Sequence, residues 1–145
     1  MNGHYFDTAY IAKCYLNEPD ADAVRAVARA SPALFISALS IAELACVFHR
    51  RLREGALRQS AATKLRDAFL EDVLNEVWLL LPVSEQLLRG VELLTRALPP
   101  DVFLRAGQAI HIVSAVQAGF NEIWTNDRHL LAAANHFGLK GRNID

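Results

Sequence analysis

The sequence has few cysteines, no long apolar run and almost no net charge, and each shortage argues against a class of protein. Its two cysteines, Cys14 and Cys46, lack the spacing of a zinc site and fall in helical apolar patterns, so we expect buried free thiols. The longest strongly apolar run covers residues 77–83, far short of the roughly 20 residues that span a bilayer. The formal net charge of −1 argues against strong non-specific binding to nucleic acid, although it leaves room for local basic patches.

The length and composition are those of one ordered globular domain, which we expect to cover residues 1–145. Hydrophobic residues make up 52% of the sequence and charged residues 21%, a balance typical of folded proteins. A domain of this size buries roughly 70% of the surface of its unfolded chain, so it needs no disulfide or structural zinc. Residues 1–10 lack the basic and apolar regions of a secretory signal, and we therefore expect a cytoplasmic protein.

Short apolar segments alternate with segments of helical periodicity, which predicts an α/β fold. We expect strands at residues 3–6, 33–36, 77–81 and 122–125, with a short edge strand within 139–144. We expect helices at residues 8–16, 21–30, 41–53, 59–74, 85–98, 104–118 and 127–137. The run 77–81 is apolar without alternation, which is typical of a strand covered on both faces. The prediction is a three-layer α/β/α sandwich around a mainly parallel sheet of four to five strands.

Three acidic residues follow the predicted strands closely, where ligands bind in open parallel sheets. Asp7 comes directly after the first strand, Glu43 lies in the first turn of the helix after the second, and Asp127 lies two residues past the fourth. Each also has a structural interpretation. Asp7 suits a helix N-cap, Glu43 suits a capping box with Ser40 as N-cap, and Asp127 suits a helix N-terminus. Only their shared position at one edge of the sheet favours a common site.

Converging carboxylates favour a bound cation because they repel one another. Two unit charges about 4 Å apart repel by roughly 4 kcal/mol at an effective dielectric constant near 20. Mg²⁺ and Mn²⁺ prefer such oxygen ligands. A cation of this kind lowers the pKa of a bound water and neutralises charge on a phosphate, which is the chemistry of phosphodiester hydrolysis.

Four motifs resemble those of the PIN-domain family, especially the VapC-type toxins, and they occur in the family's order across nearly the whole chain. They are residues 6–13 with 16–19 (FDTAYIAK and LNEP), 37–44 (SALSIAEL), 104–112 (LRAGQAIHI) and 125–130 (TNDRHL). The resemblance implies a PIN-like fold and a metal-dependent endoribonuclease, usually one half of a toxin–antitoxin pair. It also implies an RNA substrate, a cognate antitoxin and a homodimer as partners, and Mg²⁺ or Mn²⁺ as cofactor.

Carried over by position, the resemblance makes Asp7, Glu43 and Asp127 the metal-site acids, and Thr125 a helper that orients water or a carboxylate. The third motif departs from the family, which has an aspartate where this chain has Gln108. A glutamine offers a carbonyl oxygen but no charge, so we expect weaker metal binding. Its amide would also suit a hydrogen bond to one of the acids. The alternative function is therefore a catalytically weakened PIN-fold module that binds a partner protein or RNA.

Several other residues have both a structural and a functional interpretation. His111 lies near Gln108 on the same helix face, and we expect a partly buried structural histidine. The basic run 49–53 suits a solvated helix face or a phosphate-binding patch, and cations at Lys13, Arg105 and Arg128 lie near the predicted edge. Apolar residues on the helices between 21 and 74 suggest a surface for an antitoxin or a second copy. The sequence lacks the paired acids of a phospho-acceptor domain and the G-x-G-x-x-G of a dinucleotide-binding domain.

Overall fold

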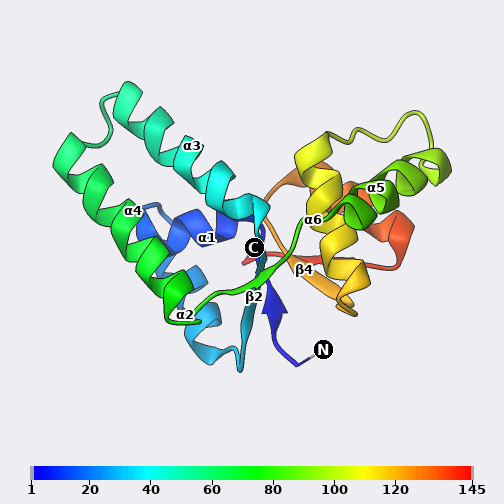
Figure 1. Cartoon of the computed structure of the whole chain (residues 1–145), viewed down its shortest axis with the longest axis horizontal. Coiled ribbons are helices and arrows are strands. Elements are labelled where there is room, and N and C mark those ends of the chain that lie inside the picture. Colours follow the sequence, from blue (N-terminus) through cyan, green and yellow to red (C-terminus); the bar gives the residue numbers. More distant parts are fainter. Residues whose placement is uncertain (1, 145) are drawn as a thin grey trace.

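The computed structural model describes residues 2–144, and over that range parallel strands alternate with helices (Figure 1). The strands are β1 (His4–Tyr5), β2 (Leu34–Ser37), β3 (Leu79–Leu81), β4 (Glu122–Trp124) and β5 (Lys140–Arg142). The helices are α1 (Thr8–Tyr15), α2 (Ala21–Ala30), α3 (Leu39–Arg53), α4 (Gln59–Leu74), α5 (Glu85–Ala97), α6 (Ala106–Gln117) and α7 (Arg128–Ala134), followed by the 3-10 turn η1 (Asn135–Phe137). The predicted α/β class is confirmed.

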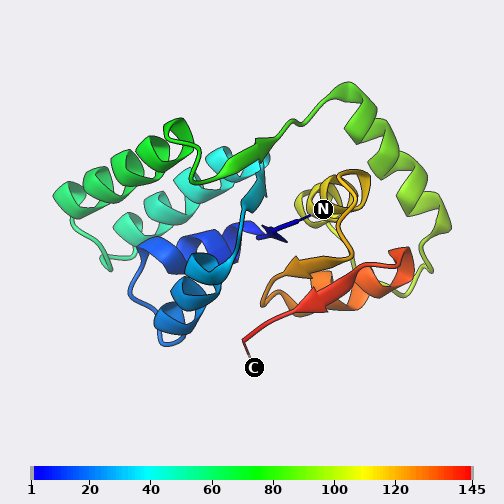
Figure 2. The same cartoon turned by 90° about the horizontal axis from the view of Figure 1, so that it is seen from below.

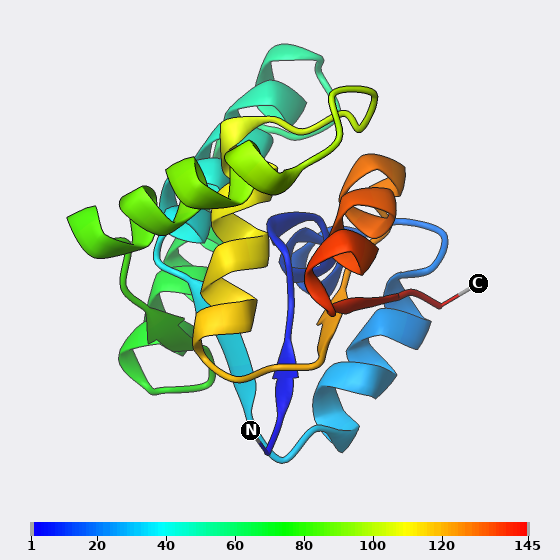
Figure 3. The same ribbon diagram turned by 90° about the vertical axis from the view of Figure 1, so that its right-hand side faces the viewer.

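The strands form two parallel sheets that meet at a single bridge. One sheet has the order β1-β2-β3 and the other pairs β4 with β5. A bridge between Phe6 and Trp124 joins them, and the Asp7 amide donates to the Trp124 carbonyl at 3.1 Å. The spatial order is therefore β3-β2-β1-β4-β5. Figure 3 shows β1 and β4 running side by side and leading into α1 and α7 at the same end.

Helices cover the strands from two sides, which gives the expected three layers. Figures 1 and 2 show α1 to α4 gathered on one side and α5 to α7 on the other. The first side is held by a mainly aromatic and aliphatic cluster that includes Phe6, Phe48 and Trp78. The second is held by a cluster that includes Tyr5, Ile112 and Leu130. Because the consecutive residues Tyr5 and Phe6 belong to the two different clusters, the residue that follows them, Asp7, is fixed between the two halves.

The third strand differs from its prediction. It begins at Leu79, and it lies at the outer edge of the sheet with β2 as its paired neighbour. Val77 is 47% exposed and Leu80 is 38% exposed, so the expected cover on both faces is wrong. An unbroken apolar run cannot distinguish a central strand from an edge strand that packs along only part of its length.

The predicted capping box at the start of α3 is also wrong. The helix begins at Leu39, and its N-cap Ala38 has no side chain that could cap it. The hydroxyl of Ser37 accepts from the Leu39 amide at 3.1 Å instead. Ser40 and Glu43 are therefore free to bond residues of other elements.

Both cysteines are free, but the expected burial fails for one of them. Cys14 is half-buried and Cys46 is exposed. Within residues 2–144, no helix combines the length and apolarity that a membrane crossing requires.

Candidate functional site

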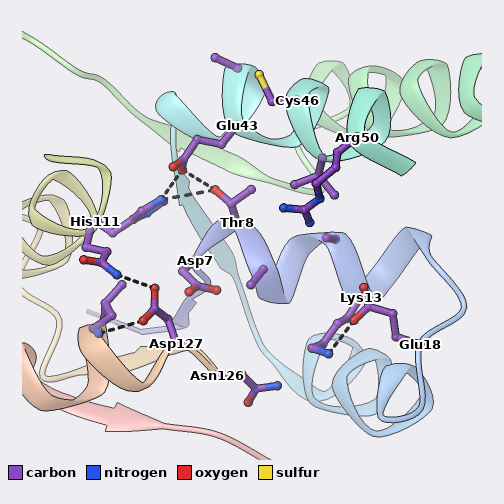
Figure 4. A pocket seen from close by; sticks show the side chains of 16 residues that line it. Asp7, Thr8, Lys13, Glu18, Glu43, Cys46, Arg50, His111, Asn126 and Asp127 are labelled. Carbon is purple, nitrogen blue, oxygen red and sulfur yellow. Dashed lines mark hydrogen bonds and ion pairs between the residues drawn. The ribbon is translucent and has the colours of Figure 1, made fainter. Parts of the chain in front are cut away.

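A cleft of about 800 Å³ opens where β1 and β4 end, and it contains most of the residues singled out in the sequence (Figure 4). Asp7, Glu43, Gln108 and Asp127 all line it. Thr125 does not line the cleft but lies fully buried beneath it. The sheet thus gathers side chains from four chain segments around one cavity.

Asp7 is buried and held by neutral donors. It is the N-cap of α1, as predicted, and its Oδ1 accepts from the Tyr10 amide at 3.0 Å. Its Oδ2 accepts from the hydroxyl of Thr125, which in turn accepts from the Asp127 amide at 2.9 Å. Burial raises the pKa of Asp7, and nearby His111 and the bonds from Thr125 and Tyr10 offset this rise only in part. Thr125 therefore joins the two aspartates, one through its side chain and the other through its backbone.

Asp127 is the N-cap of α7 and contacts Gln108 with its other oxygen. Its Oδ1 accepts from the amides of His129 and Leu130 at 2.9 and 3.2 Å. Its Oδ2 accepts from the side-chain amide of Gln108 at 2.7 Å. The Oε1 atom of Gln108 accepts from the Arg105 backbone amide at 2.9 Å, which caps α6. Both carboxylate oxygens of Asp127 are thus bonded to neutral N–H groups.

Glu43 points toward a second group of partners. Its Oε1 accepts from the hydroxyl of Thr8 at 2.7 Å and lies 2.7 Å from Nε2 of His111. A carboxylate only accepts, so Nε2 donates. Burial would raise the pKa of Glu43, but the hydrogen bond and charge of His111 and the bond from Thr8 outweigh it and hold the pKa below its usual value.

His111 has a larger part in the site than the sequence suggested. It is 3% exposed, and its Nδ1 lies 2.7 Å from the hydroxyl of Tyr5. The expectation of a partly buried structural histidine understates its burial, and the ring also contacts Glu43 directly. The spacing of three residues from Gln108 was the available signal. Thr8, which directly follows Asp7, was missed and carried no distinguishing signal.

Charged residues at the rim of the cleft pair with one another. Lys13 lies 2.7 Å from both Glu18 and Asp20, and Glu18 also accepts from Arg51 at 2.8 Å. Of the three cations expected near this edge, Lys13 lines the cleft, whereas Arg105 and Arg128 do not; Arg50, from the basic run 49–53, also lines it. Lys13 is held by two carboxylates at 2.7 Å, whereas Arg50 has only a longer, exposed pair with Glu54 at 3.7 Å, so Arg50 is the better placed group for a phosphate.

The carboxylates suit Mg²⁺ in chemistry but form no complete cage. Among residues 2–144, no group of three or more His, Cys, Asp or Glu side chains is close enough to hold a metal ion. Asp7 and Asp127 face the same part of the cleft, while Glu43 is turned toward His111 and Thr8 (Figure 4). Mg²⁺ is often held by only one or two carboxylates, with water or phosphate oxygens as its other ligands. The Asp7–Asp127 pair therefore fits a weakly held hard cation.

Comparison with known proteins identifies the fold and the family. No curated protein sequence matches the chain significantly. Among solved structures it resembles FitAcB from Neisseria gonorrhoeae, with 17% identity, 96% of each chain covered and a TM-score of 0.76. It resembles VapC20 from Mycobacterium tuberculosis, a sarcin-ricin loop cleaving toxin, with 17% identity, 89% of this chain and 93% of that chain covered and a TM-score of 0.68.

It also resembles VapBC2 from Rickettsia felis, bound to a promoter DNA fragment, with 14% identity, 98% of each chain covered and a TM-score of 0.69. At such low identities these likenesses show a shared fold. The family model described as the PIN domain matches residues 4–135. This chain therefore belongs to the PIN domain family.

Proposed function

We propose that this chain is an endoribonuclease, the toxin of a toxin–antitoxin pair, and that it cuts RNA in the cleft between Asp7, Glu43 and Asp127. The observation that carries the proposal is the placement of Asp7 and Asp127 at one cavity from opposite ends of the sequence, linked through Thr125. Family membership supports it, and so does the similar fold of a toxin that cleaves the sarcin-ricin loop. Its action on RNA would take place in the cytoplasm.

Each residue of the cleft has a distinct part in the proposal. Asp7 and Asp127 are the residues that would hold Mg²⁺ or Mn²⁺, and Glu43 faces the same cavity from α3. When bound, such an ion supplies an acidified water and neutralises phosphate charge. Thr125 orients Asp7, and Gln108 orients Asp127.

The proposed partners are a cognate antitoxin and a second copy of the chain. Exposed apolar side chains on α4, Leu70 at 50% and Leu74 at 81%, offer a surface of the expected kind. The similar VapBC2 structure was determined on promoter DNA, which is in keeping with such a complex.

The test is cleavage of structured RNA oligonucleotides by the purified chain, with and without Mg²⁺. Asp7→Asn should lower the rate by on the order of 100-fold or more, as expected for loss of a group that stabilises developing charge. Asp101→Asn is the matched control, because Asp101 is exposed and does not line the cleft. Equal rates for the two variants would disprove the assignment.

A second candidate is a PIN-fold module that binds RNA or a partner protein without cutting. The observation that favours it is the amide of Gln108, which occupies an oxygen of Asp127. In that case the wild-type chain binds RNA in a gel-shift assay without cleaving it, and Gln108→Asp gains cleavage in Mg²⁺.

A further inference from the structure

The orientation of the Gln108 amide is fixed by its two partners. Its oxygen accepts from the backbone amide of Arg105 at 2.9 Å, and its nitrogen donates to Oδ2 of Asp127 at 2.7 Å. Reversing the amide would place its N–H₂ against the Arg105 N–H and its oxygen against a carboxylate. Both contacts would be repulsive, so the hydrogen bonds allow one orientation only. Gln108 therefore presents a donor to the cleft, and its oxygen faces the backbone amide of Arg105.

The Gln108 amide occupies a carboxylate oxygen that a bound cation would use. Both oxygens of Asp127 already accept from N–H groups, and both oxygens of Asp7 accept from neutral donors. Neutral donors reduce the repulsion between two carboxylates without adding a positive ion. An ion that binds Asp127 through Oδ2 must share that oxygen with the amide of Gln108 or displace it.

We infer that Gln108 competes with the metal for Asp127, so that the cleft is assembled without a cation and binds one weakly. This rests on the proposed function, because it concerns the same site. The glutamine is then not a poor substitute for a ligand. It is a donor that stabilises the metal-free arrangement, and the cation has to overcome its hydrogen bond.

A competing Gln108 and a metal-ligating Gln108 predict opposite changes in metal affinity when the side-chain amide is removed. If Gln108 gave its oxygen to the metal, removing its side-chain amide would weaken metal binding. If it competes, removal frees Oδ2 of Asp127 and tightens metal binding. A hydrogen bond to a charged group corresponds to roughly a tenfold change in an equilibrium constant. A several-fold to tenfold gain in affinity is therefore expected from an apolar replacement of similar size.

The experiment is a calorimetric titration of MnCl₂ into the full chain without RNA. The variants are Gln108→Leu, which removes the donor, and Gln108→Glu, which keeps an oxygen for the Arg105 amide and adds a charge. Gln86→Leu is the control, since Gln86 is exposed and lies in the first turn of α5. We expect Gln108→Leu to bind Mn²⁺ up to tenfold more tightly than the wild type, Gln108→Glu more tightly still, and Gln86→Leu like the wild type.

Thermal melting gives a second reading that does not depend on activity. Gln108→Glu should melt lower than the wild type without metal, because two carboxylates then meet at Asp127, and Mn²⁺ should restore it. Weaker Mn²⁺ binding by Gln108→Leu, or equal binding by the wild type and Gln108→Glu, would overturn the inference. An absence of RNA cleavage by the wild type, with the titrations as expected, would instead disprove the proposed function alone.

Discussion

Replacing His111 with alanine removes the ring that connects Glu43 to the core. The ring lies 2.7 Å from Glu43 through Nε2 and 2.7 Å from the Tyr5 hydroxyl through Nδ1. It is 3% exposed, so water does not readily take over both contacts. The variant should therefore lose stability. It should also leave Oε1 of Glu43 with the Thr8 hydroxyl as its remaining partner of the two.

The expected loss follows from these contacts. A hydrogen bond to a charged group contributes about 1.5–3 kcal/mol and a neutral one about 0.5–1.5 kcal/mol. The Glu43 side chain is 34% exposed, and solvent screening places its bond at the lower end of that range. We expect His111→Ala to lower the free energy of unfolding by about 2–4 kcal/mol. Of this, about 1–2 kcal/mol should be coupled to Glu43.

Urea unfolding of four proteins separates the two contributions. The wild type, His111→Ala, Glu43→Ala and the double variant form a cycle whose interaction energy is the value for the pair. His49→Ala is the control, since His49 is exposed on α3 and should change stability by less than about 0.5 kcal/mol. An interaction energy near zero would show that the ring does not hold Glu43.

Three further outcomes are expected. Thr125→Val should lower the free energy of unfolding by about 2–4 kcal/mol in urea, because two buried hydrogen bonds are lost, and Thr125→Ser should recover most of it. Asp7→Asn should be more stable than the wild type at neutral pH. Burial raises the folded-state pKa of Asp7, so the wild type loses stability as the pH rises from the ordinary aspartate pKa through the raised one. The difference in unfolding free energy between Asp7→Asn and the wild type, measured in urea, should therefore vanish below about pH 4. Lys13→Met should lower the free energy of unfolding by about 1–2 kcal/mol, because Glu18 and Asp20 lose a shared cation that is 12% exposed, and a lower urea midpoint would report it.

The sequence predicted the helices and strands well because the residues that begin and end them are local signals. Helices α2 and α4 occur at the expected residues, and α5 begins at the expected Glu85, where the hydroxyl of Ser84 caps it by accepting from the Leu87 amide. The strand edge that gathers Asp7 and Asp127 followed from the parallel order alone. The helix bounds and the cap depend on residues next to one another in the chain, whereas the shared edge depends on the order and direction of the strands.

Contacts between distant residues were beyond sequence reasoning. The pattern Ser40 to Glu43 satisfies the rule for a capping box, yet the hydroxyl of Ser40 bonds Thr8 at 2.9 Å and the helix begins earlier. A rule based on neighbouring residues takes no account of a competing hydrogen-bond partner 32 residues away. A hydrogen bond from the Gln108 amide to one of the acids was expected, but the choice of Asp127 could not be predicted, since the orientation of the amide depends on Arg105 and Asp127 together.

The seam between β1 and β4 has one bridge, and the backbone amide of Asp7 belongs to it. Buried side chains of Tyr5, Phe6, Ile123 and Trp124 pack across that bridge, so this amide proton should exchange with solvent only when the core opens. A spectroscopist who follows that one proton would therefore be following whether Asp7 and Asp127 stay together. Any molecule that widens the seam would separate the two aspartates without touching either of them.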